Sequence, residues 1–186
     1  MMDNQLETTR LILRHWQAED YPAYAKINAN PFVMEYFPAA LSEEESYQQV
    51  DHMKVFLEEH NWGLWAVELK DTGEFIGFVG LNRKDATSGI PNSPLIEIGW
   101  RLSPEHWGKG YATEAAHKAL EFAFNELEVK QVYAFTTVTN ARSRQVMDSI
   151  GMQDMQQDFS HPKLDPEHPL AQHCLYKLTK EQWLSD

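Results

Sequence analysis

The chain has 186 residues, of which 42% are hydrophobic and 12% aromatic, so we expect enough apolar surface for one core and one domain over residues 1–186. Its 16 basic and 28 acidic residues give a formal charge of −12, which argues against nucleic acid or an anionic membrane as a partner and favours cationic partners. No apolar run approaches the roughly 20 residues that span a bilayer, and no signal-peptide pattern opens the chain. With Cys174 as the only cysteine, these features predict a cytoplasmic protein without an internal disulfide.

The first half of the chain mixes short strands with helices. A helix is expected from about Glu19 to Asn28, and a second helix follows Ser42, whose spacing to Glu45 is that of a capping box. The turn-forming run Lys70–Gly73 separates two β-prone segments and indicates a hairpin. The predicted strands of this half cover residues 11–16, 64–69 and 74–82.

The second half contains the clearest helix, over residues 112–127, where apolar residues keep an i, i+3, i+4, i+7 spacing. A shorter helix is predicted from Ala141 to Ile150, with Gly151 in the position of a C-cap glycine. The predicted strands of this half cover residues 95–102, 132–138 and 174–178. Because hairpins alternate irregularly with crossovers, the sheet is expected to be mixed rather than uniformly parallel.

Two glycines stand between the strand that ends at Leu102 and the clearest helix. Gly108 and Gly110 flank Lys109, which frees the backbone to turn sharply and to bring its N–H groups close to a ligand. Unpaired N–H groups and the helix dipole make such a helix start an anion site. The run fits neither a Walker A loop nor a dinucleotide-binding fingerprint. The alternative is a turn that only connects a strand to a helix.

The sequence around this turn resembles motif A of the GNAT acetyltransferases, and within them the RimJ/RimL branch. The resemblance rests on the runs Glu97–Leu102, Trp107–Ala115, Thr9–Arg14, Asn140–Ser143 and Gly151–Met152. One departure is Trp107, which stands where the wider family has Gln or Arg, although binding by main-chain amides does not depend on that side chain. The resemblance implies a GNAT fold, an α/β (α+β) architecture with a mixed, mostly antiparallel twisted sheet of about seven strands flanked by helices.

The resemblance also implies acetyl-CoA as co-substrate and no metal. The residues it assigns to acetyl-CoA are Leu102, Trp107, Gly108, Lys109, Gly110, Tyr111, Ala112, Thr113 and Asn140. A main-chain N–H at the end of the strand near Leu102 would then stabilise the developing oxyanion. Asn140 has a second interpretation, because it is also suited to cap the helix that begins at Ala141.

Glu97 is the candidate general base, since an acidic residue within the apolar run Leu95–Ile98 is out of place unless it faces a cleft. The alternative is a residue on the solvent face of the strand. Ser143 is the candidate acid or hydrogen-bond donor, because the position that holds a tyrosine in some GNAT enzymes is Met147 here. The histidines at 161, 168 and 173 match no standard zinc motif.

Three functions remain open from the sequence. The first is acetylation of a protein N-terminal amine, as the RimJ/RimL resemblance implies, and the acidic surface suits a basic protein such as a ribosomal one. The second is acetylation of a small-molecule amine such as an amino acid, a polyamine or an antibiotic. The third is a module that binds acyl-CoA without turnover. The sequence leaves a monomer and a homodimer equally open.

Overall fold

The computed structural model describes residues 5–186. Its backbone contacts group the chain into two compact units, which are treated one at a time below. The first unit consists of the chain up to Gly80 together with Gly99–Ala119, and the second of Leu81–Ile98 together with Leu120–Asp186. Three elements run through both units: β4 (Phe75–Lys84), β5 (Leu95–Leu102) and α3 (Tyr111–Asn125).

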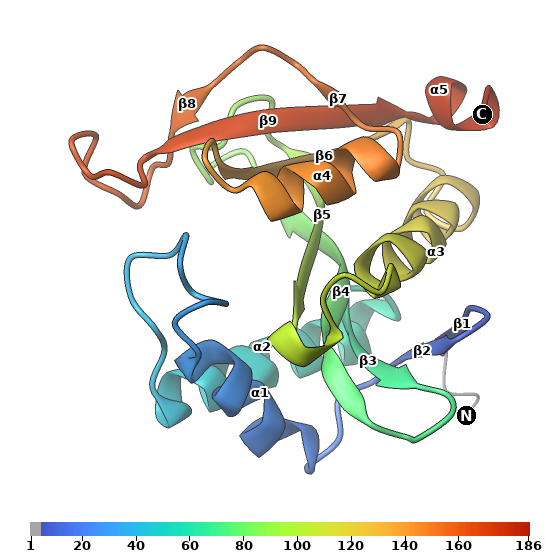
Figure 1. The fold of residues 1–186 in the computed structure, drawn as a ribbon. Helices are drawn as coiled ribbons and strands as arrows, with labels where there is room; N and C mark the ends of the chain where they lie inside the picture. Colours follow the sequence, from blue (N-terminus) through green and yellow to red (C-terminus); the bar gives the residue numbers. More distant parts are fainter. Residues whose placement is uncertain (1–4) are drawn as a thin grey trace. The chain divides into compact units, whose positions relative to one another are not determined.

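The first unit is built on an antiparallel run of strands and two long helices. Strands β1 to β4 pair in chain order, each antiparallel to the next in the pairs that the register defines. Helices α1 and α2 lie side by side, as Figure 1 shows. The elements that lie wholly in this unit are β1 (Leu6–Glu7), β2 (Leu11–Arg14), α1 (Asp20–Ala29), α2 (Glu43–His60), β3 (Leu64–Leu69) and the 3-10 turn Pro104–His106.

The second unit is organised around the long antiparallel pair of β6 and β9, which runs from Gln131 opposite Thr179 to Thr137 opposite His173. The short strands β7 and β8 both pair with β9, while β5 pairs with β6 in parallel where Glu97 faces Tyr133. Helix α4 packs on β6, as Figure 1 shows. The elements are β6 (Gln131–Thr137), α4 (Ala141–Ser149), β7 (Gln153–Asp154), β8 (Phe159–Ser160), β9 (Gln172–Thr179) and α5 (Lys180–Leu184).

The hydrogen-bonded strands form one mixed, mostly antiparallel sheet in the order β1-β2-β3-β4-β5-β6-β9-β7, with β8 added on β9. The described residues contain nine strands, where about seven were expected. Every predicted strand is present, and the additional ones, β1, β7 and β8, have two residues each. Such short segments pair because their neighbours hold them in place, not because of a period of their own.

The helix ends follow the local chemistry of the sequence. Ser42 and Glu45 form the predicted capping box at the start of α2, with each side chain bonded to the other residue's backbone N–H. Gly151 follows the last turn of α4 with φ of 86°, a left-handed conformation that glycine adopts without steric cost. A second capping box, Thr179 with Gln182, starts the unpredicted helix α5.

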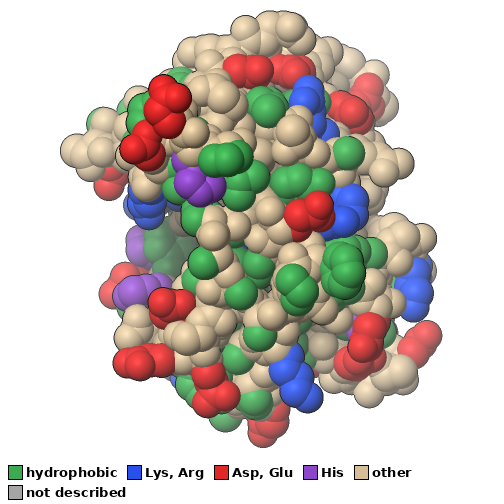
Figure 2. All heavy atoms as spheres, turned by 60° about the vertical axis from the view of Figure 1, so that its left-hand side comes forward, with side chains coloured by type: hydrophobic (Ala, Val, Ile, Leu, Met, Phe, Trp, Pro, Cys, Tyr) green, Lys and Arg blue, Asp and Glu red, His purple; other side chains and the backbone are tan. Residues whose placement is uncertain are grey.

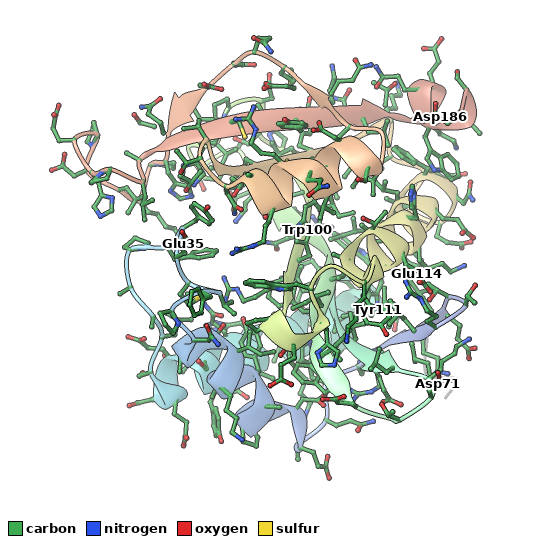
Figure 3. All side chains as sticks on the ribbon, in the orientation of Figure 1. Glu35, Asp71, Trp100, Tyr111, Glu114 and Asp186 are labelled. Carbon is green, nitrogen blue, oxygen red and sulfur yellow. The ribbon has the colours of Figure 1, made fainter. Side chains whose placement is uncertain are left out.

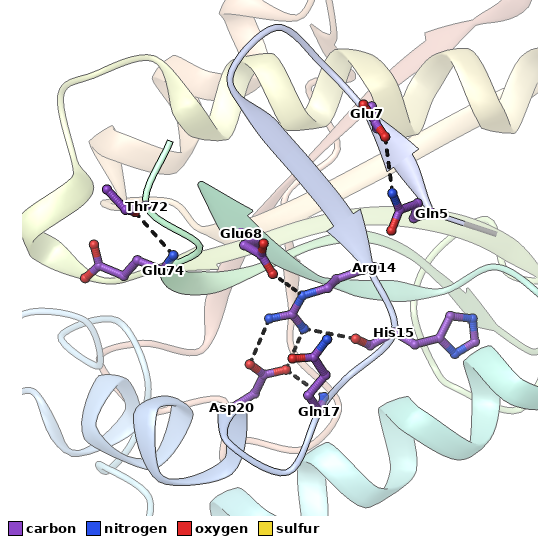
Figure 4. A network of polar contacts seen from close by, with 9 residues as sticks. All are labelled: Gln5, Glu7, Arg14, His15, Gln17, Asp20, Glu68, Thr72 and Glu74. Atoms are coloured by element: carbon purple, nitrogen blue, oxygen red, sulfur yellow. Dashed lines mark hydrogen bonds and ion pairs between the residues drawn. The ribbon is translucent and has the colours of Figure 1, made fainter. Parts of the chain in front are cut away.

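The first unit contains a buried ion-pair network that joins β2, β3 and α1. The Arg14 guanidinium donates to both carboxylate oxygens of Asp20, at 2.7 and 3.1 Å, and to Glu68 at 2.6 Å (Figure 4). Arg14 is 7% exposed and Asp20 2%, so both charges depend on each other for compensation. Trp65, on β3, is 1% exposed and lies in the core.

Two further properties of the chain concern its surface. Acidic side chains are spread over the face drawn in Figure 2, in keeping with the net charge of −12. Among the described residues, no helix is both long and apolar enough to cross a membrane. Cys174 is completely buried, as expected for a lone thiol.

Candidate active site

The predicted donor loop adopts a conformation that only glycine accepts easily at two positions. Gly108 has φ of 74° and Gly110 has φ of 79°, both in the left-handed region. Gly108, Lys109 and Gly110 are all exposed, so a ligand in solution can reach their backbone. The two glycines therefore shape an accessible turn directly before α3.

Helix α3 presents unpaired backbone donors at this turn. Its hydrogen-bond ladder begins with the bond from Glu114 N to Gly110 O at 3.0 Å. The amides of Tyr111, Ala112 and Thr113 precede that ladder and have no acceptor within the helix. Together with the positive end of the helix dipole, these amides are the arrangement from which the sequence predicts an anion site.

The loop is held by Arg10, which lies near the start of the first unit's sequence. The Arg10 guanidinium donates to the Glu114 carboxylate at 2.7 Å and to the Lys109 carbonyl at 2.9 Å. Its Cζ lies 4.4 Å from the centre of the Tyr111 ring. Figure 3 labels Tyr111 and Glu114 in the first turn of α3. We call this arrangement of Arg10, Lys109, Tyr111 and Glu114 the loop clamp.

Glu114 is tied a second time to the same N-terminal segment. The Thr8 hydroxyl donates to Glu114 at 2.7 Å, and the Arg10 backbone N–H donates to it at 2.9 Å. Although burial alone would raise the pKa of Glu114, these hydrogen bonds and the Arg10 charge lower it. Arg10 and Glu114 both lie in motifs of the family resemblance, which gave neither residue a role. Their pairing across 104 residues has no local sequence signal.

Trp107 has a structural role in the same unit. Its indole N–H donates to the Leu102 carbonyl at 3.0 Å, and its ring packs against the cluster of Ile27, Val33 and Met34. The side chain thus fixes the loop to the end of β5. This agrees with the view that the amides, and not the side chain at position 107, carry ligand binding.

Glu97 lies on β5 in the second unit, with 17% of its side chain exposed. Burial raises its pKa to about 7, against a smaller opposing effect of Lys84, whose ammonium lies 3.8 Å away. The interpretation as an ordinary solvent-facing strand residue does not fit this burial. A carboxyl group that titrates near neutral pH can exchange a proton with an amine in either direction.

Asn140 caps helix α4, and this was one of its two interpretations. Its side-chain oxygen accepts from the Ser143 backbone N–H at 3.2 Å. Its amide nitrogen donates to the hydroxyls of Thr136 and Ser143, at 3.0 and 3.1 Å. The Ser143 oxygen therefore acts as an acceptor here, and its own proton stays available for donation. Met147 is 1% exposed and belongs to the core.

Arg144 and two histidines of the second unit have contacts of their own. Arg144 donates to the Val138 carbonyl, to the Tyr176 hydroxyl and to Asp154, the last at 3.1 Å. His161 and His173 lie with their ring centres 4.9 Å apart, and burial lowers the pKa of both, to about 4 for His161. The shift favours the neutral form of both rings.

The predicted site residues are thus distributed over two units. The donor loop 107–113 and Leu102 lie in the first unit, and Glu97, Asn140 and Ser143 lie in the second. Within the first unit the structure joins the loop, the end of β5 and the loop clamp. Within the second it joins Asn140 to Ser143, and Glu97 to Lys84.

Comparisons with known proteins identify the family. Residues 10–153 match the acetyltransferase (GNAT) domain. The chain is 31% identical over 149 residues to the uncharacterized protein YkkB of Bacillus subtilis, covering 80% of this chain and 84% of that one. It is 30% identical over 184 residues to the FsC-acetyl coenzyme A-N(2)-transacetylase of Aspergillus fumigatus, covering 96% and 77%.

A crystal structure of an acetyltransferase from Agrobacterium tumefaciens superposes with a TM-score of 0.74 at 27% identity, over 95% of this chain and 94% of that one. The mixed sheet and its flanking helices are therefore those of a known fold. The chain belongs to the GNAT family of N-acetyltransferases and is an acyltransferase.

Proposed function

We propose that the protein transfers the acetyl group of acetyl-CoA to a primary α-amine, by direct attack of the neutral amine on the thioester. The first candidate acceptor is a protein N-terminus, and the second is a small-molecule amine. We further propose that the whole chain acts as one acetyltransferase domain. The observation that carries the proposal is the partly buried Glu97, with a pKa of about 7.

We assign acetyl-CoA binding to the first unit because the backbone amides at the start of α3 have no acceptor within the helix. An acidic protein repels a polyanion at long range, so coenzyme A needs a local site of positive potential. The amides of residues 111–113 supply such a site, and the exposed turn from Gly108 to Gly110 lets phosphate oxygens approach. Leu102 and Asn140 are proposed to contact the rest of the cofactor, with a β5 main-chain N–H stabilising the oxyanion.

The pKa values of the candidate amines, compared with that of Glu97, favour one class of acceptor. An α-amine has a pKa of about 7.7–8.0, while a lysine side chain has about 10.4. A base that titrates near 7 removes a proton from an α-ammonium at little cost, but it is poorly matched to lysine. The coenzyme A thiolate leaves without strict need of an acid, and Ser143 is proposed as a hydrogen-bond donor to it. The matched pKa values therefore favour an α-amine as acceptor.

Each candidate acceptor has an independent observation in its favour. The formal charge of −12 favours a basic protein whose N-terminus is presented to the site. The relative from Aspergillus fumigatus is named FsC-acetyl coenzyme A-N(2)-transacetylase, and a name that specifies one numbered nitrogen supports a small-molecule amine as the acceptor. The same chemistry serves both acceptors.

Mass spectrometry of products from a panel of N-terminal peptides and small amines, each incubated with acetyl-CoA, tests the proposal. A gain of one acetyl group on the α-amine, and none on peptides offering only lysine, is expected. In the same assay Glu97→Gln should lower kcat about 10²–10⁴-fold and abolish the acid limb near pH 7. The control is Glu126→Gln, which removes an exposed carboxylate from the same unit.

Two outcomes would contradict parts of the proposal. Tight binding of coenzyme A without any acetylated product would favour a binding module over an enzyme. An unchanged pH–rate profile in Glu97→Gln would remove Glu97 from the proton transfer while leaving the acetyltransferase assignment intact.

A further inference from the structure

Arg101 differs from other arginines of the chain in what surrounds its charge. It lies on the last part of β5 in the first unit and is half-buried. Its Nη1 donates to the Tyr24 hydroxyl at 3.1 Å and to the Asn28 side-chain oxygen at 2.9 Å. Among residues 5–186 it forms no ion pair with a carboxylate, whereas Arg10, Arg14 and Arg144 each form at least one.

The two neutral acceptors hold the guanidinium in a defined position. Tyr24 and Asn28 are 1% and 0% exposed, so they are fixed in the core. The Tyr24 hydroxyl donates to Gln49 at 2.7 Å, and the Asn28 amide donates to Ser46 at 3.0 Å. Each therefore presents an oxygen to Arg101 with its donor already engaged. An arginine anchored in this way loses little further freedom when it binds a ligand.

The contacts also define which edge of the guanidinium remains open. Both hydrogens of Nη1 are used by Tyr24 and Asn28. Nε and Nη2 carry the other three N–H groups, and within the described part of the chain they donate no hydrogen bond to the protein. These two nitrogens form the edge that accepts a carboxylate through two parallel hydrogen bonds. The open edge therefore has the geometry of a bidentate carboxylate site.

A glycine and two aromatic rings accompany Arg101 in the first unit. Gly99 stands two residues before Arg101 on β5, so its missing side chain belongs to the same face of the strand. A methyl group placed on Gly99 would meet no atom within 4 Å apart from its chain neighbours. The ring of Phe37, 43% exposed, lies 4.6 Å from the Arg101 Cζ, and the Phe78 ring lies 5.6 Å away. The guanidinium thus contacts two aromatic rings, and β5 has open space at Gly99, two residues before it.

We infer that Arg101 binds a carboxylate carried by the amine acceptor, so that the preferred substrates are amines with a nearby carboxylate. This inference rests on the proposed acetyl transfer to an α-amine and narrows its substrate class. The net charge of −12 repels anions from the protein as a whole. The anchored Arg101 guanidinium, which has no acidic partner, attracts an anionic group at this one position and so distinguishes acceptors that carry a carboxylate. The carboxylate can be the α-carboxylate of an amino acid or the side chain of an acidic residue near a peptide N-terminus.

The test compares acceptors with and without the carboxylate, with rates expressed per neutral amine because an α-carboxylate also raises the pKa of the neighbouring amine. One arm pairs free amino acids with their carboxamides, and the other pairs Ser-Glu-Ala-amide with Ser-Gln-Ala-amide. Initial rates with saturating acetyl-CoA should show a kcat/KM about 10- to 100-fold higher for the acid in the arm that represents the natural source. Equal values in both arms overturn the inference without recourse to any variant.

Variants then attribute the preference to this residue. Arg101→Gln should bring the acid-to-amide ratio close to one, and Arg101→Lys should keep only part of it because a lysine lacks the fork. Lys130→Gln removes an exposed positive charge elsewhere and should leave the ratio unchanged. If Arg101→Gln keeps the preference, or raises the KM for acetyl-CoA while keeping it, the carboxylate is not bound by Arg101 and the inference fails.

Calorimetry separates this inference from the proposed function. The N-acetylated forms of the two peptides and of the amino acids are titrated into the protein with coenzyme A bound. Tighter binding of the acid form to the wild type than to Arg101→Gln supports the inference even if no acceptor is turned over. Absence of any acetylated product would contradict the proposed function alone, and equal binding of acid and amide forms would contradict the Arg101 site alone.

Discussion

Replacement of Gly108 by alanine tests the donor loop with a matched control in the same unit. Gly108 has φ of 74°, and Gly73, in the β3–β4 turn, has φ of 73°. A side-chain carbon built at either position meets no atom within 4 Å apart from its chain neighbours. Alanine at both positions therefore carries the same backbone strain without a clash, and the two variants differ in whether the turn faces a ligand.

The expected magnitudes follow from these conformations. A left-handed residue other than glycine costs about 1–2 kcal/mol, so both variants should lose this much free energy of unfolding in urea. Relaxation of that strain at position 108 would turn the loop amides away from a bound phosphate. A partly buried helix-terminus interaction contributes up to about 2 kcal/mol, which corresponds to a loss of up to about 30-fold in coenzyme A affinity.

Isothermal titration with coenzyme A measures the affinity of Gly108→Ala, Gly73→Ala and the wild type at two salt concentrations. The Gly108 variant should bind about 10- to 30-fold more weakly, and the Gly73 variant should bind like the wild type. Equal Kd values for the two variants, at equal loss of stability, would refute the assignment of phosphate binding to this turn.

Three further predictions concern charged groups. Because burial raises the pKa of Glu97 from 4.5 to about 7, folding favours its protonated form, and the free energy of unfolding should fall by up to about 3 kcal/mol between pH 5 and 8. Urea titrations should show this fall abolished in Glu97→Gln, and its persistence would contradict the pKa. Arg14→Met should cost about 3–5 kcal/mol because it leaves the Asp20 charge buried without a partner, and adding Asp20→Asn should recover part of it. A loss under about 1 kcal/mol would contradict the network. Glu114→Gln should cost at most about 1 kcal/mol of stability through the part-exposed Arg10 pair, yet weaken coenzyme A binding several-fold, as calorimetry would show. Unaltered affinity would leave the loop clamp without a role in binding.

The long elements could be predicted because their patterns are local. Strands β3 and β5 occupy the predicted residues, and α3 is displaced by one or two residues at its ends. Strands β1, β7 and β8 were missed, since two residues are too few to show a period. Helix α5 had a usable signal in its Thr179 and Gln182 capping box, which was not exploited.

The conformation of the candidate site could be predicted where it depends on the backbone. Glycines between a strand and a helix mark a donor loop in any sequence, and the conformations of Gly108 and Gly110 agree with that expectation. Contacts between side chains that are far apart in the sequence have no comparable local pattern. The pairing of Arg10 with Glu114, and the anchoring of Arg101 by Tyr24, depend on the tertiary fold and became visible only in the structure.

The loop clamp has a practical consequence for how this protein is produced and handled. Residues 8–10 hold the exposed turn of residues 108–110, which the chain forms about a hundred positions later. A protease cut, a truncation or a fusion tag placed against this leading segment would loosen a remote turn while sparing most of the core. Protein tagged at the C-terminus should therefore give coenzyme A affinities closer to those of the untagged protein.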